Sequence, residues 1–132
     1  MPTTTIPASH RNLLDASPIV TLATSGPDGF PQVSAIWFVA EEDGTIATSL
    51  NTARQKVKNL GRNPEATLFF VDPTNPYRTL EIRARATLTP DPEYTFAERI
   101  GTKYGANPRE MDQPGETRVA VQFVPVKVNT FG

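Results

Sequence analysis

Residues 44–62 read GTIATSLNTARQKVKNLGR, and in this stretch an extended run passes directly into a basic helix. Residues 44–50 are typical of a strand, whereas residues 51–62 carry four positive charges and no negative charge. Thr52 and Gln55 have the spacing of a capping box over the first helical turn. The sequence therefore predicts a strand that delivers the chain to the N-terminus of a short helix.

This helix N-terminus is the part of the sequence that most favours an anion. The unpaired N–H groups of a first turn and the positive end of the helix dipole attract a phosphate or a carboxylate. Arg54 and Lys56 add two mobile charges beside them. The alternative is a solvated helix face with Val57 and Leu60 turned to the core, as most charge runs are. The residues alone leave both interpretations open.

The composition limits the chemistry that is open to the chain. Its 132 residues predict a single domain over 1–132, with 38% hydrophobic residues and thirteen prolines that shorten regular elements. There is no cysteine, which excludes disulfides and thiolate chemistry, and one histidine, His10, predicts no metal site. The net charge of −1 argues against nucleic acid as a partner.

The sequence also predicts where the protein is found. No apolar run approaches the roughly 20 residues that a membrane-spanning helix needs. Residues 1–8 lack the charged and apolar regions of a signal peptide. We therefore expect a cytoplasmic protein that has no membrane partner.

Six extended runs predict a mainly β fold. By hydrophobic pattern they cover 19–24, 32–39, 45–50, 66–71, 78–88 and 117–128. The first three are joined by turns so short that only antiparallel hairpins fit between them. The last run changes its apolar parity between Phe123 and Val124, which predicts a bulge near Pro125.

Two further helices are predicted, one before the first run and one between the fifth run and the sixth. The first covers 9–16 and is capped by Ser9, and the second begins at Asp91 and Pro92 and ends at Gly105. Six antiparallel strands with short helices after the third and the fifth fit a small closed barrel better than a sandwich, because closure removes exposed strand edges.

Several motifs, in this order and spacing, resemble the split β-barrels related to pyridoxamine 5'-phosphate oxidase. They are similar in particular to the actinobacterial branch that binds the deazaflavin coenzyme F420. The motifs lie between Leu13 and Phe131, at 19–24, 26–31, 34–38, 54–60 with Pro64, and 76–78. The resemblance implies a homodimeric, six-stranded antiparallel split β-barrel whose cofactor lies in the groove between the subunits.

The resemblance also implies a set of cofactor-binding residues. Helix residues would hold the phosphate, hydroxyl groups at the strand end would donate hydrogen bonds, and strand backbone would lie along the polar edge of the ring. Two residues after the fourth strand would reach the cofactor of the other subunit. In chain order the set is Ser34, Ile36, Trp37, Thr48, Ser49, Arg54, Gln55, Lys56, Asn59, Tyr77 and Arg78.

Some of these residues have an equally simple structural interpretation. Trp37 lies on a strand that is apolar on both faces, so core packing explains it as well as contact with a cofactor does. Tyr77 and Arg78 follow a loop with two prolines, and the alternative for them is a solvated surface loop.

From this resemblance we expect an F420-dependent reductase that passes hydride from the reduced cofactor to a small conjugated, electrophilic substrate. No acid–base dyad or activated nucleophile is visible, so no catalytic residue is expected. True pyridoxamine phosphate oxidases bring an arginine and a histidine to the substrate near their C-terminus, whereas here the only histidine is His10. The alternatives are an FMN-binding flavin reductase or oxidase, a non-catalytic cofactor carrier, and a haem-binding relative. Haem is disfavoured because His10, the only histidine, lies outside the predicted strands.

Overall fold

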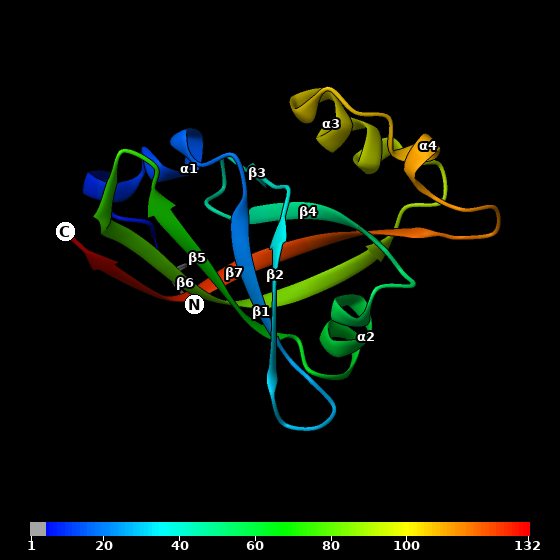
Figure 1. The fold of residues 1–132 in the computed structure, drawn as a ribbon, viewed down its shortest axis with the longest axis horizontal. Helices are drawn as coiled ribbons and strands as arrows, with labels where there is room; N and C mark the ends of the chain where they lie inside the picture. Colours follow the sequence, from blue (N-terminus) through cyan, green and yellow to red (C-terminus); the bar gives the residue numbers. More distant parts are fainter. Residues whose placement is uncertain (1–4) are drawn as a thin grey trace.

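The computed structural model describes residues 5–132 as one curled antiparallel sheet with short helices around it (Figure 1). Seven strands follow the order β2-β1-β5-β6-β7-β4-β3. Their bounds are β1 Val20–Ser25, β2 Pro31–Ile36, β3 Val39–Ala40, β4 Ile46–Asn51, β5 Glu65–Asp72, β6 Asn75–Pro90 and β7 Arg118–Phe131. The predicted mainly β, antiparallel fold is confirmed, with seven strands in place of six.

The helices lie at the ends and edges of this sheet. They are the 3-10 turn η1 Ala8–His10 and the helices α1 Leu13–Ala16, α2 Gln55–Arg62, α3 Thr95–Tyr104 and α4 Pro108–Met111. Figure 1 shows α1 over one end of the sheet and α3 with α4 over the other. α2 packs on β1, and α3 packs on β4 and β7. No helix within residues 5–132 combines the length and the apolar character that a membrane span requires.

The seventh strand arises because the predicted run 32–39 breaks at Trp37 and Phe38. The backbone N–H of Phe38 donates to the Tyr104 hydroxyl at 3.1 Å, and its carbonyl accepts from Lys103 Nζ at 2.6 Å. Both groups are therefore bound by α3 side chains, which takes them out of the sheet. β2 consequently pairs with β1 and not with β4, and the expected second hairpin is shortened to β3 with β4, where Val39 pairs with Ala47 and Ala40 with Ile46.

The sheet curls without closing. β2 and β3 stand at the two ends of the strand order, and within residues 5–132 they form no ladder with each other. The expected closed barrel is thus a half-barrel. Near its open side, the hydroxyl of Thr48 on β4 donates to the carbonyl of Trp37, which lies between β2 and β3, at 2.6 Å.

The core fills the concave side of the curled sheet. Leu22, Leu68 and Ile82 lie in one register row across β1, β5 and β6, and all three are fully buried. Phe38 packs edge-on against Phe70, with 5.3 Å between the ring centroids. Because alternate residues of a strand face opposite sides, the residues between these rows point outward.

The bulge predicted near Pro125 is confirmed. Arg83 pairs with Lys127 and Ala84 with Pro125, so β7 has one extra residue between these two pairs. This bulge lets the long strands β6 and β7 bend together, which is how two strands take part in one strongly curled sheet.

The N-terminal helix differs from its prediction over 9–16. Ser9 caps no helix, since its hydroxyl bonds His10 Nδ1 at 2.9 Å, and the regular part begins only at Leu13. His10 is buried, with its Nε2 3.2 Å from the carbonyl of Phe131. The histidine therefore joins the two ends of the described chain.

The helix expected to have Asp91 as its N-cap and Pro92 as its first residue begins three residues later, at Thr95. The Asp91 carboxylate still accepts the backbone N–H groups of Phe96 and Ala97, at 3.2 and 2.9 Å. It thus accepts hydrogen bonds from backbone N–H groups in the first turn of α3, although Asp91 itself lies before the helix. The end at Gly105 is as predicted, with a φ of +67° that favours glycine.

Candidate functional site

The N-terminus of α2 is left without a cap. The predicted capping box does not form, because the Thr52 hydroxyl lies 2.7 Å from that of Thr117 and the Gln55 amide donates to Asn59 at 2.9 Å. The backbone N–H groups of Gln55 and Lys56 have no acceptor within residues 5–132. Free N–H groups at a helix start are suited to bind a phosphate or a carboxylate.

A hollow of about 190 Å³ lies at this helix end, and we call it the α2 pocket. Its walls come from β2, β4, α2, α4 and β7. The structure brings five of the predicted site residues to it, together with five others. The complete lining is Ala35, Ile36, Trp37, Ser49, Leu50, Asn51, Arg54, Lys56, Met111 and Arg118.

Arg54 and Lys56 place two cations at the α2 end of the pocket. Within residues 5–132 neither side chain forms an ion pair or a hydrogen bond. Burial, and secondly the charge of Arg54, lower the pKa of Lys56 below its ordinary value. Burial and a like charge both disfavour the charged ammonium form of Lys56. An anion bound between Lys56 and Arg54 would offset this repulsion, and the two cations would stabilise the anion in turn.

Asn59 and Thr48 are used inside the protein. Asn59 is fully buried, and its amide donates to Thr24 at 3.0 Å and to Gln32 at 3.1 Å. Thr48 is also fully buried and donates to the carbonyl of Trp37. The lining of the α2 pocket in the single chain contains neither side chain, and Asn59 stabilises the packing of α2 on the sheet.

Three more predicted residues lie outside the α2 pocket of the single chain. Ser34 is half-buried on β2, and Tyr77 is 76% exposed on β6. Arg78 forms an ion pair with Asp72 at 3.0 Å and donates to Asn12 at 2.6 Å. Its guanidinium is therefore occupied within its own chain, where it holds the β5–β6 hairpin against the N-terminal segment.

Trp37 is both a packing residue and a pocket residue. It stacks on Tyr104 of α3, with ring centroids 4.6 Å apart and ring planes 5° from parallel. The half-buried Trp37 side chain also lines the pocket. The two interpretations of this residue are thus compatible, because one side of a ring packs while another part remains open.

Sequence reasoning missed the opposite end of the pocket, at Arg118. Its guanidinium binds both oxygens of Asp112 at 2.8 Å, and Nη1 lies 3.4 Å from the Ser49 hydroxyl. Asp112 also accepts from the Tyr94 hydroxyl at 2.6 Å and from Asn51 at 3.0 Å. These hydrogen bonds, that of Arg118 first, lower the pKa of Asp112 to about 2. No local pattern signals this pairing, since its members lie on separate elements.

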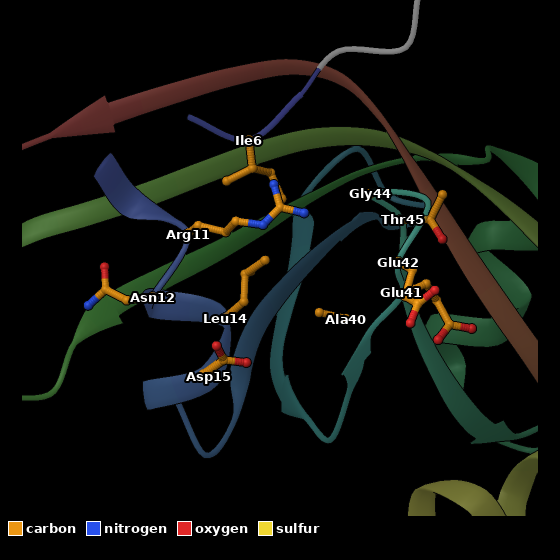
Figure 2. Close-up of a pocket in the computed structure, with 10 residues that line it drawn as sticks. All are labelled: Ile6, Arg11, Asn12, Leu14, Asp15, Ala40, Glu41, Glu42, Gly44 and Thr45. Carbon is orange, nitrogen blue, oxygen red and sulfur yellow. The ribbon is translucent and has the colours of Figure 1, made fainter. Parts of the chain in front are cut away.

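A larger hollow of about 400 Å³ opens elsewhere, between α1 and the β3–β4 turn. Figure 2 shows Arg11 on the α1 side of it and the carboxylates of Glu41 and Glu42 on the other. With Asp15 the lining has three carboxylates and one guanidinium, so it disfavours a phosphate. No cluster of metal-binding side chains occurs among the described residues. The α2 pocket is therefore the better anion site.

Comparison with known proteins establishes the family. The pyridoxamine 5'-phosphate oxidase family matches residues 6–131, and the chain belongs to this family. A pyridoxine/pyridoxamine 5'-phosphate oxidase of Rhodopseudomonas palustris is 31% identical over 116 residues, which are 83% of this chain and 52% of the relative. The chain thus spans about half the length of the curated relatives it matches.

Solved structures share the fold over nearly the whole chain. A protein described as an F420 reductase is 31% identical with a TM-score of 0.81, covering 94% of this chain and 98% of the other. A conserved hypothetical protein of Mycobacterium tuberculosis is 26% identical with a TM-score of 0.74, covering 98% of this chain and 86% of the other. The split-barrel family assignment made from the motifs is confirmed.

Proposed function

We propose that the chain binds coenzyme F420 in the α2 pocket and passes hydride from the reduced cofactor to a small conjugated, electrophilic substrate. The observation that carries this proposal is the uncapped start of α2, where two free N–H groups meet the unpaired charges of Arg54 and Lys56. The similarity to an F420 reductase over 94% of the chain supports a deazaflavin as the ligand.

The residues of the pocket fit a phosphorylated ring compound. Arg54 and Lys56 would bind the phosphate, while the apolar side chains of Ile36 and Leu50 and the ring of Trp37 would cover the ring system and exclude water. When bound, the deazaflavin supplies the hydride chemistry. The lining contains no acid–base pair, so the chain's own part is binding and orientation, and protonation of the product is left to solvent.

A second copy of the chain would complete the pocket. The volume of about 190 Å³ is below the range of roughly 300–1,000 Å³ that is usual for small-molecule sites. The strand register places Val33, Phe69, Val71 and Phe131 on the outward face of the sheet, and these side chains are 39–65% exposed. We therefore propose a homodimer that covers this apolar face and holds the cofactor at the interface.

In such a dimer the two residues after the β5–β6 turn take different roles. Tyr77, which is 76% exposed, would reach the pocket of the other copy. Arg78 would keep the hairpin in place through Asp72 and Asn12.

Sedimentation of Phe69→Glu tests whether the outward apolar face of the sheet forms the dimer interface. We expect this variant to be a monomer, and a dimer that is unchanged by the added charge would place the interface elsewhere.

A second candidate is an FMN-dependent reductase or oxidase that uses the same pocket. It is favoured by the 31% identity to a pyridoxine/pyridoxamine 5'-phosphate oxidase. The α2 end of the pocket suits the phosphate of either cofactor, because a helix N-terminus recognises the anion and not the ring.

Turnover distinguishes these functions. Reduced F420 is mixed with the protein and a panel of quinones and enones, and its oxidation is followed by absorbance, with a parallel titration against FMN. We expect faster oxidation with at least one acceptor and tighter binding of F420 than of FMN. A yellow purified protein that retains FMN would support the second candidate. Reduced F420 that binds to the protein but is oxidised no faster with any acceptor would indicate a carrier.

A further inference from the structure

The α2 pocket has a second basic wall, formed by Arg118 at the start of β7. In the sheet register Arg118 lies opposite Asn51, the last residue of β4, and both line the pocket. Ser49, also in the lining, lies 3.4 Å from Arg118 Nη1. The pocket therefore has an arginine at the β7 end as well as the cations of α2.

Asp112 holds this arginine in one orientation. Nε and Nη2 of Arg118 donate to its two carboxylate oxygens, each at 2.8 Å, and the two side chains are only 10% and 4% exposed. Asp112 is fixed in turn by Tyr94 and Asn51. Such a bidentate pair sets the plane of the guanidinium, so a ligand meets a donor that is already oriented.

The guanidinium retains donors for a ligand. Of the five N–H groups of an arginine side chain, two bind Asp112 and one is directed at Ser49 over a long 3.4 Å. The others have no acceptor within residues 5–132. Arg118 therefore combines a fixed position with free N–H groups on a pocket wall.

The two ends of the pocket differ in net charge. At the β7 end Asp112 neutralises Arg118, and Asn51 also donates to the carboxylate of Glu116 at 3.0 Å. At the α2 end Arg54 and Lys56 have no counter-ion among the described residues. A full anion is therefore favoured at α2, and a neutral acceptor such as a carbonyl oxygen is favoured at β7.

We propose that Arg118 is a specificity-determining residue that donates a hydrogen bond to a neutral carbonyl oxygen of the ligand whose phosphate lies at Arg54 and Lys56. This inference rests on the proposed function, because the ligand is the same one. It adds the orientation: the phosphate is directed to α2 and a carbonyl edge of the ring to β7.

Calorimetric titration with three probes tests this assignment. The probes are F420, its phosphate-free deazaflavin chromophore, and inorganic phosphate. For Arg118→Gln we expect about tenfold weaker binding of F420 and of the chromophore, as for the loss of one hydrogen bond to a charged group, with phosphate unchanged. Arg54→Gln should weaken F420 and phosphate and leave the chromophore unchanged. The double variant should add the two effects, because they act at separate ends.

If Arg118→Gln does not fold, Arg118→Lys provides a second test of the proposal. The ammonium still pairs with Asp112 but lacks the guanidinium fork, so the chromophore should again bind about tenfold more weakly while the thermal midpoint stays near that of the unaltered protein. A merely structural arginine would weaken all three probes together. Two results overturn the inference about Arg118 and leave the proposed function standing. They are an unchanged affinity for the chromophore in a folded variant, and an equal loss of affinity for all three probes. An unaltered protein that binds neither F420 nor the chromophore overturns the proposed function and this inference with it.

Discussion

Two arginines line the same pocket, and the protein treats them in opposite ways. Arg54, next to the free N–H groups of α2, is exposed and has no partner among the described residues. Arg118 is 10% exposed and bound bidentately by Asp112. The difference indicates that the β7 end is built for a fixed structure, whereas the α2 end leaves charge and backbone donors unsatisfied. Unsatisfied groups of this kind favour a ligand over stability.

Removal of the Asp112–Arg118 ion pair at the β7 end of the pocket should have the largest effect on stability. Asp112→Ala removes the counter-ion of a buried guanidinium, and such a loss lowers the free energy of unfolding by about 3–5 kcal/mol. Arg54→Ala is the matched change at the other end and should alter it by less than about 0.5 kcal/mol. Urea unfolding of both variants measures the contrast. Similar losses at the two ends would refute it.

Removal of a cation at the α2 end of the pocket should instead weaken ligand binding. Lys56→Ala removes a cation from the pocket, so the affinity for F420 should fall by about 1.5–3 kcal/mol, the range for a hydrogen bond to a charged group. Lys58→Ala on the same helix is the control, since Lys58 is exposed and lies outside the pocket lining. Titration at two salt concentrations gives both values, and equal losses would mean that only the overall charge matters.

The β7 end should also respond to acid. The pKa of Asp112 is lowered from 3.8 to about 2 in the folded chain. A lowered carboxyl pKa contributes stability above about pH 4, and this contribution is lost as the pH falls from about 4 to 2; its size is about 2 kcal/mol. Urea unfolding across this range should therefore show the unaltered protein and Asp112→Asn converging. A difference that stays constant down to pH 2 would contradict the pairing.

A side-chain cap on α2 should make the protein more stable and its binding of F420 weaker. Arg54 occupies the N-cap position of the helix, and serine there accepts a hydrogen bond from the first turn. Arg54→Ser should raise the free energy of unfolding by about 1 kcal/mol and weaken F420 binding at the same time. Thermal unfolding and titration of one sample measure both. A variant that is more stable and binds equally well would show that the open helix end has no part in binding.

The elements that follow from local pattern could be predicted from the sequence. Alternation identified the long strand through Leu80 and Ile82, charge and position identified α2, and a change of parity located the bulge near Pro125. Gly105 ended its helix as expected. Each of these features depends on neighbours in the chain, and a single sequence contains that information.

The features that depend on distant partners could not be predicted. The break at Phe38 is caused by the hydroxyl of a tyrosine 66 residues further along the chain. The basic motif around Asn59 contains no signal for Thr24 and Gln32, which accept hydrogen bonds from its buried amide. Arg118 and Asp112 are only six residues apart, but their pairing depends on the irregular backbone between α4 and β7, which leaves no periodic pattern in the sequence.

The most direct test of the account is an NMR titration of backbone amides with F420. If the uncapped start of α2 binds the phosphate, the N–H signals of Gln55 and Lys56 should show the largest downfield shifts and saturate with the cofactor. If these two signals stay in place while residues around Arg11 and Glu41 move, the ligand binds in the other hollow. That result would contradict the central claim.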